Sequence, residues 1–346
     1  MMRALVYEQL GATPEVQQVP EPEVPASGVV LRVGATGVCR SDWHAWVGHD
    51  PDIVLPHVPG HEFAGTVVGV GERVENWAVG DRVTTPFLLA CGSCTHCRRG
   101  VQNLCDRSSQ PGFASWGSFA ELVAVPFADV NLVRLPEQME FATAASLGCR
   151  FVTSFRAVVD RARTSAGEWV AVHGCGGVGL SAVMIARALG ARVVAIDIHA
   201  DKLALAVAAG ADAVVDASTE DVVTAVRDLT GGGAHVSIEA LGHRDVFLNS
   251  VRGLRKQGRH VQVGLMMGDS EPASLHTDEV LFNELEVLGS FGMPSHRYDA
   301  MLAMIDAGLL QPEKLIGRTL GLAEAGEALM TVGTSTVPGV SVVVDP

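Results

Sequence analysis

Residues 168–179 read EWVAVHGCGGVG, an apolar run followed by a glycine-rich turn. An apolar run of β-forming residues ends at Val172. Gly174, Gly176 and Gly179 then follow the pattern G-x-G-x-x-G, directly before an apolar-striped stretch that suits a helix. Glycines at this spacing allow a tight turn, close approach of the backbone to a pyrophosphate and close packing of helix on strand. The stretch therefore predicts a strand–turn–helix unit that holds phosphates at the start of the helix.

Asp197 closes the next apolar run, 23 residues after Gly174. A carboxylate at this distance accepts hydrogen bonds from the ribose of a bound dinucleotide, and it repels the 2′-phosphate that distinguishes NADP from NAD. The pattern therefore predicts NAD as the cofactor. A glycine turn followed by a solvated aspartate remains the alternative interpretation.

The pattern of apolar runs and residue types along the chain changes near Thr153. Residues 1–90 contain short runs rich in Gly, Pro and Val, with no stretch long enough to predict a helix. After Thr153, apolar β runs alternate with Ala-rich helical stretches, as is typical of βαβ units on a parallel sheet. We expect an α/β protein with a β-rich domain at 1–152, a doubly wound parallel-sheet domain at 153–290, and a return of the chain to the first domain at 291–346.

The composition restricts the possible partners. The 346 residues are 48% hydrophobic and 18% charged, which excludes wholesale disorder. A formal net charge of −14 repels phosphate backbones and anionic membranes, and so disfavours a nucleic-acid or membrane partner. No signal peptide is visible, and the most apolar stretch, 141–159, is interrupted by Arg150 and Arg156. We expect a cytoplasmic protein.

Four of the seven cysteines lie within residues 91–105, CGSCTHCRRGVQNLC, as Cys91, Cys94, Cys97 and Cys105. Two successive two-residue gaps let neighbouring thiolates face one centre, and the longer gap returns the fourth. This closed four-thiolate set suits a structural zinc ion. Bacterial ferredoxins also begin with two such gaps, but their fourth cysteine follows after three residues and precedes proline. A disulfide-paired or redox loop remains the minor alternative.

A second group of potential metal ligands is scattered along the chain. Cys39 lies in GVCRSDWH, His61 and Glu62 lie in GHE, and Cys149 lies in LGCRFVT. Two thiolates and one imidazole leave the fourth position of a zinc ion open for a substrate oxygen. Spacing alone does not group these residues, because a lone cysteine or histidine is more often a packed core residue.

These motifs occur together in one known order. GVCRSD, PHVPGHEFAGTVVGVG, VGDRV, the four-cysteine loop, LGC and GCGGVG follow one another as in the zinc-dependent medium-chain alcohol dehydrogenases, which the chain resembles over nearly its whole length. The resemblance implies a GroES-like catalytic domain interrupted by a Rossmann coenzyme domain, with the active site between them. It also implies reversible hydride transfer between an alcohol, aldehyde or ketone and NAD(H), with one catalytic and one structural zinc ion per chain.

The same resemblance implies roles for the residues near the metal. Cys39, His61 and Cys149 would be the catalytic-zinc ligands, and Glu62 a nearby acid that can enter or leave the coordination sphere. Asp42 would orient His61 through the free ring nitrogen.

Proton transfer and coenzyme binding are implied in the same way. Ser41 would receive the alcohol proton and His44 would pass it to solvent, although a turn cap and a surface histidine are the plainer interpretations. Zinc would polarise the substrate oxygen while the hydride moves to the nicotinamide. The expected coenzyme contacts are Arg40 at the pyrophosphate, Thr153 and Val178 at the nicotinamide, Lys202 at the adenosine ribose beside Asp197, and the turn residues Gly174, Gly176, Gly177 and Gly179.

Two positions depart from the family. Arg150 follows the third zinc ligand, where many members have a small residue, and it could point away from the cleft or favour a polar substrate. Ser341 stands about where members often carry an arginine that meets the pyrophosphate. We expect coenzyme affinity to depend more on Arg40 and on backbone amides.

The substrate is less well specified. By alignment with the family, the bulky residues Trp43, Phe87, Leu88 and Trp116 are candidates for the pocket lining, and they favour apolar alcohols or aldehydes over sugars. Each could equally be a core residue. Members of this length are commonly homotetramers, so an oligomer is expected.

Two other classes of protein remain as alternatives. A zinc-free NADPH-dependent quinone or enone reductase of the same superfamily would share the fold but lack both zinc sets. A zinc-loop module that binds nucleic acid or protein would perform no catalysis, and the net charge argues against it.

Overall fold

Six parallel strands form the sheet that the glycine-rich stretch predicts. In spatial order they are β10 (Ala213–Asp216), β9 (Arg192–Asp197), β8 (Trp169–His173), β11 (Ala234–Glu239), β12 (Leu254–Gln262) and β13 (Glu286–Gly289). This computed structural model describes residues 1–266, 273–332 and 339–346. The strand order reverses between β8 and β11, and such a switch point opens a crevice at the carboxyl ends of the strands.

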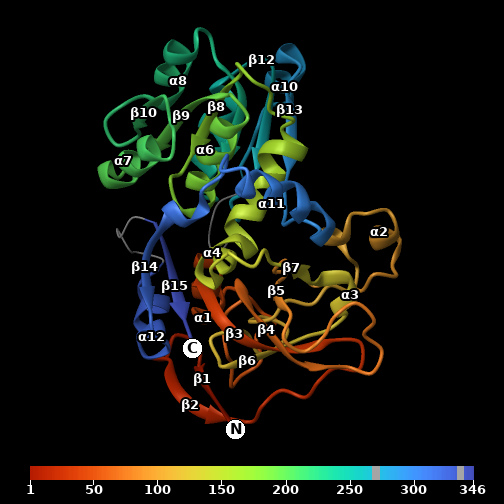
Figure 1. The fold of residues 1–346 in the computed structure, drawn as a ribbon. Helices are drawn as coiled ribbons and strands as arrows, with labels where there is room; N and C mark the ends of the chain where they lie inside the picture. The colour runs from red at the N-terminus through yellow and green to blue at the C-terminus, as the bar shows by residue number, and fades with distance from the viewer. Residues whose placement is uncertain (267–272, 333–338) are drawn as a thin grey trace.

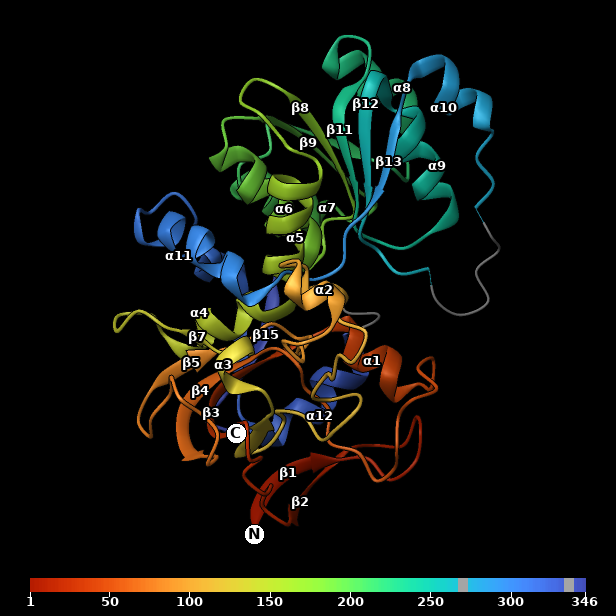
Figure 2. The same cartoon turned by 90° about the vertical axis from the view of Figure 1, so that its right-hand side faces the viewer.

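Helices cover both faces of this parallel sheet. They are α6 (Gly177–Ala188), α7 (Ala200–Ala208), α8 (Val222–Thr230), α9 (Arg244–Arg252) and α10 (Thr277–Asn283). Figure 2 shows α6 on one side of the strands and α8 and α9 on the other. The predicted doubly wound arrangement is therefore confirmed.

A second, largely antiparallel sheet builds the other part of the molecule (Figure 1). Its strands are β14 (Ile316–Leu320), β15 (Val340–Val344), β3 (Val29–Val38), β4 (Phe63–Val70), β5 (Arg82–Thr84) and β7 (Val133–Arg134), while β6 (Leu122–Val125) also pairs with β3. A separate hairpin joins β1 (Met2–Val6) to β2 (Glu15–Val19). The last strand, β15, pairs with β3 so that Ser341 lies opposite Val38. The predicted β-rich part is therefore confirmed.

Short helices pack around this second part and connect it to the parallel sheet. They are α1 (Arg40–Trp46), α2 (Thr95–Arg98), α3 (Ala128–Asn131), α4 (Phe141–Ser146), α5 (Val152–Phe155), α11 (Tyr298–Asp306) and α12 (Leu322–Thr331), with 3-10 turns at Gln102–Leu104, Ser295–Arg297 and Pro312–Leu315. Helix α1 differs from the expectation that residues 1–90 form no helix. Its seven residues are too few to show a helical period in the sequence.

One helical connection joins the two parts of the molecule. Helices α4 and α5 alternate with π-helical segments at Leu147–Phe151 and Arg156–Arg161, and together they run from the antiparallel sheet to α6. Buried residues of both parts belong to one hydrophobic core, which includes Ala35 and Ala64 on one side and Val170 and Val172 on the other. Because this core is continuous, the walls of the crevice between the parts are held in place.

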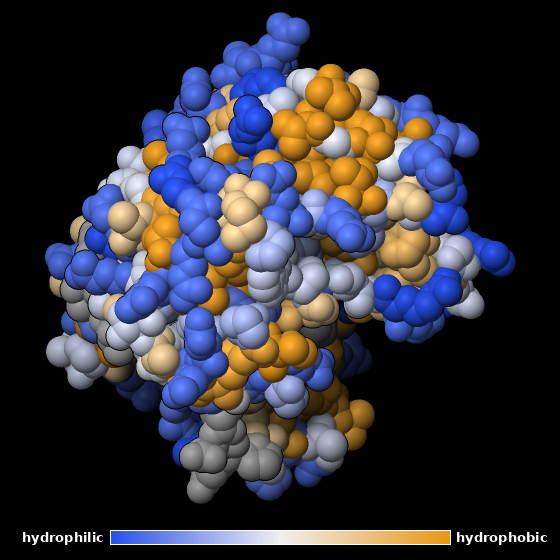
Figure 3. Space-filling model, turned by 90° about the horizontal axis from the view of Figure 1, so that it is seen from below, coloured by the Kyte–Doolittle hydropathy of each residue, from blue (hydrophilic) through white to orange (hydrophobic). Residues whose placement is uncertain are grey.

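Among the described residues, no helix combines the length and the apolar character needed to cross a bilayer. Seen from below, hydrophilic residues surround several apolar areas, the broadest of them at the upper right of the view (Figure 3), and exposed apolar atoms are usual in globular proteins.

Candidate active site

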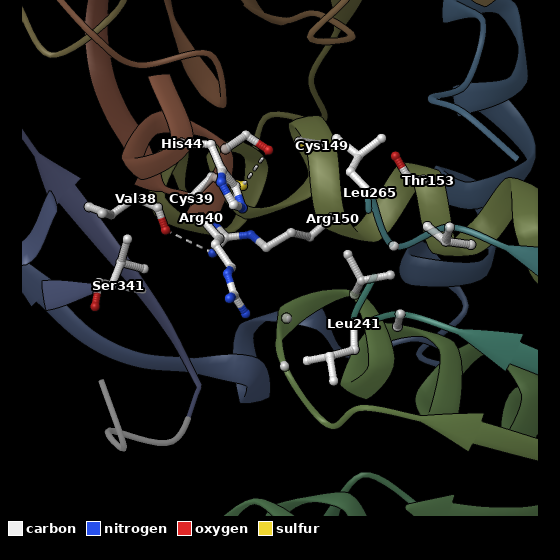
Figure 4. Close-up of a pocket in the computed structure, with 18 of the residues that line it drawn as sticks. Val38, Cys39, Arg40, His44, Cys149, Arg150, Thr153, Leu241, Leu265 and Ser341 are labelled. Atoms are coloured by element: carbon white, nitrogen blue, oxygen red, sulfur yellow. Dashed lines mark hydrogen bonds between the residues drawn. The ribbon is translucent and has the colours of Figure 1, made fainter. Parts of the chain in front are cut away.

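A cavity of about 550 Å³ lies between the two sheets. Its walls carry residues from both sequence motifs. From the antiparallel side come Cys39, Arg40, Ser41, His44, His61 and Cys149, and from the parallel side come Gly176, Gly177, Val178, Asp197 and Lys202. Figure 4 shows part of this lining around Cys39 and Arg150. The fold therefore places the scattered ligand candidates and the glycine turn around one space.

Four potential metal ligands converge on one side of this cavity. One ligand atom from each of Cys39, His61, Glu62 and Cys149 lies within 4.8 Å of the others. Nε2 of His61 is buried without a hydrogen-bond partner, and its Nδ1 lies 2.8 Å from Oδ1 of Asp42. A buried imidazole nitrogen without a partner, aimed at two thiols, is the donor set that zinc binds. These residues therefore fit a zinc ion.

The Asp42 carboxylate holds this cluster together. Asp42 lies in the first turn of α1, and Oδ2 accepts a hydrogen bond of 3.0 Å from the backbone N–H of Cys39. Oδ1 accepts a second bond of 3.1 Å from the N–H of Gly60, besides its contact with His61. One buried carboxylate thus fixes both chain segments that supply ligands, and orients the imidazole.

The charges of the cluster favour a thiolate at Cys39. A hydrogen bond from the Cys149 thiol lowers the pKa of Cys39 well below its usual range, against the effect of burial, and His61 and Arg150 lower it further. Burial alone would lower the pKa of His61, but Asp42 and Cys39 raise it well above its usual value. The thiolate is the form of cysteine that binds metal.

Arg150 turns into the cavity and does not point away from it. Nη2 of Arg150 pairs with Oε2 of Glu62, and Nη1 donates a hydrogen bond of 3.0 Å to the carbonyl oxygen of Val38. The Arg150 side chain is 9% exposed and that of Glu62 is 0% exposed. The positive charge is therefore paired with a carboxylate beside the metal ligands, and no sequence pattern predicts this pairing.

Ser41 and His44 line the cavity on the first helix of the chain, α1. Oγ of Ser41 lies 3.7 Å from Sγ of Cys39. Nδ1 of His44 lies 2.9 Å from Nδ1 of His49, an exposed residue that sequence reasoning missed. Burial lowers the pKa of His44, and Arg40 and His49 lower it further, so this ring is neutral near pH 7. The pair forms a polar path from the cavity toward the surface.

The glycine turn follows β8 and begins α6. Gly176 is the N-cap residue of α6, and a β-carbon added there would meet no atom within 4 Å, so its backbone is open to a ligand. A β-carbon on Gly179 would instead collide with the carbonyl of Gly174. Gly174 and Gly179 therefore shape the turn, and unlike Gly176 they are not among the residues that line the cavity. Both features fit the phosphates of a dinucleotide.

Asp197 ties this turn to the next strand. Its Oδ2 accepts a hydrogen bond of 2.8 Å from the N–H of Cys175, and Oδ1 accepts bonds from the N–H groups of Ile198 and His199. Asp197 and Lys202 both line the cavity, as does Thr153. Cys175 is buried with its thiol 3.7 Å from the carbonyl of Ile196, which suits a packed residue.

Aromatic rings close the cavity near the metal cluster. The ring of Phe113 meets the imidazole of His61 edge-on at 5.4 Å between centroids, and Phe87 meets Phe291 at 5.5 Å. Of the four pocket candidates from the sequence, Phe87 lines the cavity, whereas Trp43, Leu88 and Trp116 are not among its lining residues. Phe113 and Phe291 were missed because no local pattern marks a residue that reaches the site only through the fold.

The four-cysteine loop forms a separate cluster. Sγ of Cys94 lies 3.5 Å from Sγ of Cys97 and 3.8 Å from that of Cys105, while Cys91 and Cys97 are 4.0 Å apart. A tetrahedron with zinc–sulfur bonds of about 2.3 Å has edges of about 3.8 Å. Two backbone N–H groups, those of Cys91 and Arg107, each donate to the Cys105 sulfur at 3.3 Å. All seven cysteines are free thiols, so the residues fit a structural zinc ion and not a disulfide.

A parallel sheet with a glycine turn, facing a cluster of cysteine and histidine, is the architecture of a dinucleotide-dependent dehydrogenase that binds metal. Residues 25–137 match the family model of the alcohol dehydrogenase GroES-like domain, and residues 177–307 match that of zinc-binding dehydrogenases. The chain belongs to the zinc-dependent medium-chain alcohol dehydrogenase family.

Individual relatives agree with this placement. The chain is 36% identical to an alcohol dehydrogenase of Geobacillus stearothermophilus over 84% of each chain. It is 32% identical to an NAD-dependent alcohol dehydrogenase of Sulfurisphaera tokodaii over 95% of each chain. Among solved structures, the alcohol dehydrogenase TADH from Thermus sp. ATN1 superposes with a TM-score of 0.90 at 33% identity, covering 99% of both chains.

Proposed function

We propose that this protein is an NAD-dependent alcohol dehydrogenase that interconverts an alcohol with its aldehyde or ketone at a zinc ion. One observation carries the proposal. The cluster of Cys39, His61 and Cys149 and the glycine turn at Gly176 and Gly177 line the same cavity. Hydride transfer needs the substrate carbon and the nicotinamide side by side, and this cavity offers both sites within one enclosure.

Zinc held by Cys39, His61 and Cys149 would supply a Lewis acid that makes the hydroxyl of a substrate more acidic. The Ser41 hydroxyl accepts the substrate proton as it donates its own proton to His44. Since Nδ1 of His44 is engaged by His49, Nε2 is the nitrogen left to receive the proton. His44 then donates its Nδ1 proton to Nδ1 of His49, and the exposed His49 releases its Nε2 proton to solvent.

The coenzyme side is organised by the parallel sheet. The backbone at Gly176, Gly177 and Val178 receives the phosphates at the start of α6, and Arg40 adds a positive charge from the opposite wall. Asp197 accepts hydrogen bonds from the adenosine ribose beside Lys202. The carboxylate repels a 2′-phosphate, which supports NAD over NADP.

The finer features of the proposal follow from the same residues. Each chain holds two zinc ions, one catalytic and one in the four-cysteine loop. The domains span 1–152, 153–290 and 291–346, supported by the sheet to which each segment contributes strands.

The free cysteines support a reducing location such as the cytoplasm. The exposed Phe282, and Val287 in the edge strand β13, support association of chains through this edge, and the family resemblance favours a homotetramer.

The substrates are small apolar alcohols, because Phe87, Phe113 and Phe291 surround the metal side of the cavity. A zinc-free quinone or enone reductase is less well supported, since both ligand clusters are formed among the described residues. Nucleic-acid and membrane partners remain disfavoured by the net charge.

The test combines metal analysis with kinetics. Cys39→Ala or His61→Ala should reduce the zinc content from two ions per chain to one and abolish NADH formation, while NADH binding stays largely intact. Cys175→Ala removes a buried thiol outside both clusters and should retain two zinc ions. Full activity in a variant without the catalytic zinc would refute the proposal, as would the absence of NADH formation across primary, secondary and aromatic alcohols.

A further inference from the structure

Arg150 is a buried cation between the metal-ligand cluster and the glycine turn. It lies in the π-helical segment Leu147–Phe151, directly after Cys149, and its side chain is 9% exposed. Burying a guanidinium is costly unless its donors find partners. The partners of Arg150 therefore indicate what this side chain is for.

The hydrogen bonds of Arg150 leave one of its three nitrogens without a partner. Nη2 is bound to Glu62 and Nη1 to the carbonyl of Val38, but Nε is buried and has no acceptor. A buried charged donor that lacks an acceptor costs more than an ordinary missing hydrogen bond. Such a donor in a ligand cavity points to an acceptor that arrives with the ligand.

The unpartnered nitrogen faces the start of α6. A β-carbon added to Gly177, the first residue of that twelve-residue helix, would collide with Cδ of Arg150 and lie 3.5 Å from Nε. The first N–H groups of a helix have no partners within the helix and carry partial positive charge, so they attract phosphates. The free Nε of Arg150 and the free N–H groups of α6 thus converge on one place.

The charges around this place are predominantly positive. Arg40, Arg150, Lys202 and Arg318 line the cavity, against the two acids Asp50 and Asp197. This excess stands out in a chain with a net charge of −14. Figure 4 shows the Arg150 side chain reaching across the cavity toward Val38 and Arg40. An anion bound over the turn would therefore meet guanidinium groups from the opposite wall.

We propose that Arg150 binds the pyrophosphate of the coenzyme through Nε while Nη2 holds Glu62 beside the metal ligands. One guanidinium then contacts both the coenzyme and the carboxylate next to the catalytic metal site. Glu62 presents its second oxygen, Oε1, without a partner. Arg150 thereby fixes the distance between the dinucleotide and the metal cluster. The inference depends on the proposed function, because it requires a dinucleotide in this cavity.

The experiment measures binding, so that it does not depend on turnover. Glu62→Gln serves as the baseline, and Glu62→Gln with Arg150→Met removes both charges together, which avoids leaving one buried ion unpaired. Calorimetry with NADH, ADP-ribose and AMP separates the subsites, because the first two ligands carry the pyrophosphate and AMP carries a single phosphate. Zinc content is measured on each preparation.

We expect the double variant to bind NADH and ADP-ribose at least about tenfold more weakly than Glu62→Gln, as for a lost charged hydrogen bond. AMP binding should change by less than about twofold, and both zinc ions should remain. Arg150→Lys keeps the charge but loses the Nε donor, and should also weaken ADP-ribose more than AMP. If the double variant does not fold, Arg150→Lys alone tests whether the Nε donor contacts the pyrophosphate.

The outcomes separate this inference from the proposed function. Equal ADP-ribose affinity in the double variant and in Glu62→Gln would overturn the role of Arg150 and leave the dehydrogenase intact. Equal weakening of AMP and ADP-ribose would also overturn it, since that result indicates a general disturbance of the cavity. If the unmodified protein binds neither NADH nor ADP-ribose, the proposed function itself fails.

Discussion

The imidazole of His44, which lines the active-site cavity, is in contact with that of the exposed His49. Because the lowered pKa of His44 leaves that ring neutral near pH 7, it can accept a proton there. We predict that His44→Ala lowers kcat for alcohol oxidation about 100-fold near pH 7, as for a lost general base. The loss should shrink at high pH, where hydroxide replaces the base, and added imidazole should restore part of the rate. A pH profile with and without imidazole tests this, and an unchanged rate at every pH would contradict it.

Phe113 shapes the substrate side of the cavity through its edge-on contact with His61. We predict that Phe113→Ala lowers kcat/KM for an aromatic alcohol about 10- to 100-fold, because the substrate ring loses apolar contact area. The value for ethanol, which is too small to reach the ring fully, should change much less. Trp116→Phe is the matched control, since Trp116 is not among the lining residues. Equal losses for both alcohols in Phe113→Ala would argue against an aromatic pocket.

Residues with a chemical motif were predictable from the sequence, and residues defined by contacts were not. Cys39, His61 and Cys149 were grouped by the resemblance, and the structure brings their ligand atoms together. The ion pair of Arg150 with Glu62 joins positions 88 residues apart, and no local pattern encodes such a contact. Their side-chain directions depend on the π-helical segment and on the sheet, which form only in the complete fold.

The strand–turn–helix unit of β8 and α6 is the element whose glycines can be tested separately. A β-carbon at Gly179 would collide with backbone, whereas one at Gly176 would point into open space. We predict that Gly179→Ala lowers the free energy of unfolding by about 1–3 kcal/mol, while Gly176→Ala leaves it within about 0.5 kcal/mol.

For NADH binding, the larger effect is expected in Gly176→Ala, the variant whose stability changes less. Gly176→Ala should weaken NADH without loss of stability, because the added methyl group occupies the approach of the phosphates. Urea unfolding and NADH titration of both variants measure the two effects. A Gly179→Ala protein as stable as the parent would show that the strand and helix can separate, contrary to the close contact described above.

Elements with strong periodicity were the predictable ones. The alternation after Thr153 indicated the parallel sheet, because buried strands and apolar-striped helices each have a distinctive period. Helix α1 was missed because seven residues span two turns and its cap is Cys39, not one of the usual capping residues. The π-helical segment around Cys149 was also missed, since the extra residue in such a turn leaves no compositional trace.

At the scale of the molecule, segments from opposite ends of the chain meet in one sheet. The partners of the closing β run are not obvious from the local sequence, and in the structure it lies between β14 and the distant strand β3. Pairing between distant segments is selected by the whole core and not by local propensity. The core continues through both parts, so disturbances in the parallel sheet are expected to affect the stability of the entire protein.

Two buried histidines of the parallel sheet connect this stability to pH. Both ring nitrogens of His173 lack hydrogen-bond partners, while Nδ1 of His260 lies 3.2 Å from Ser237 Oγ and 3.0 Å from Ser250 Oγ. Burial, with a smaller effect of His260, lowers the pKa of His173 to about 3, and burial lowers the pKa of His260 to about 4. In the unfolded chain both rings titrate near pH 6.5. The unfolded state therefore binds more protons than the native state below that pH.

Acidification should consequently destabilise the protein through these two groups, and neither group contributes a pH dependence above about pH 7. Each ring should lower the free energy of unfolding by roughly 2 kcal/mol between about pH 7.5 and about pH 5. In His173→Phe that decrease should be smaller by this amount, and His260→Gln should behave similarly. Urea unfolding followed by tryptophan fluorescence, to which Trp169 at the start of β8 contributes, measures the difference at the two pH values. Metal loss at low pH affects parent and variants alike, so an identical decrease in all three proteins would mean that these histidines do not remain neutral in the native sheet.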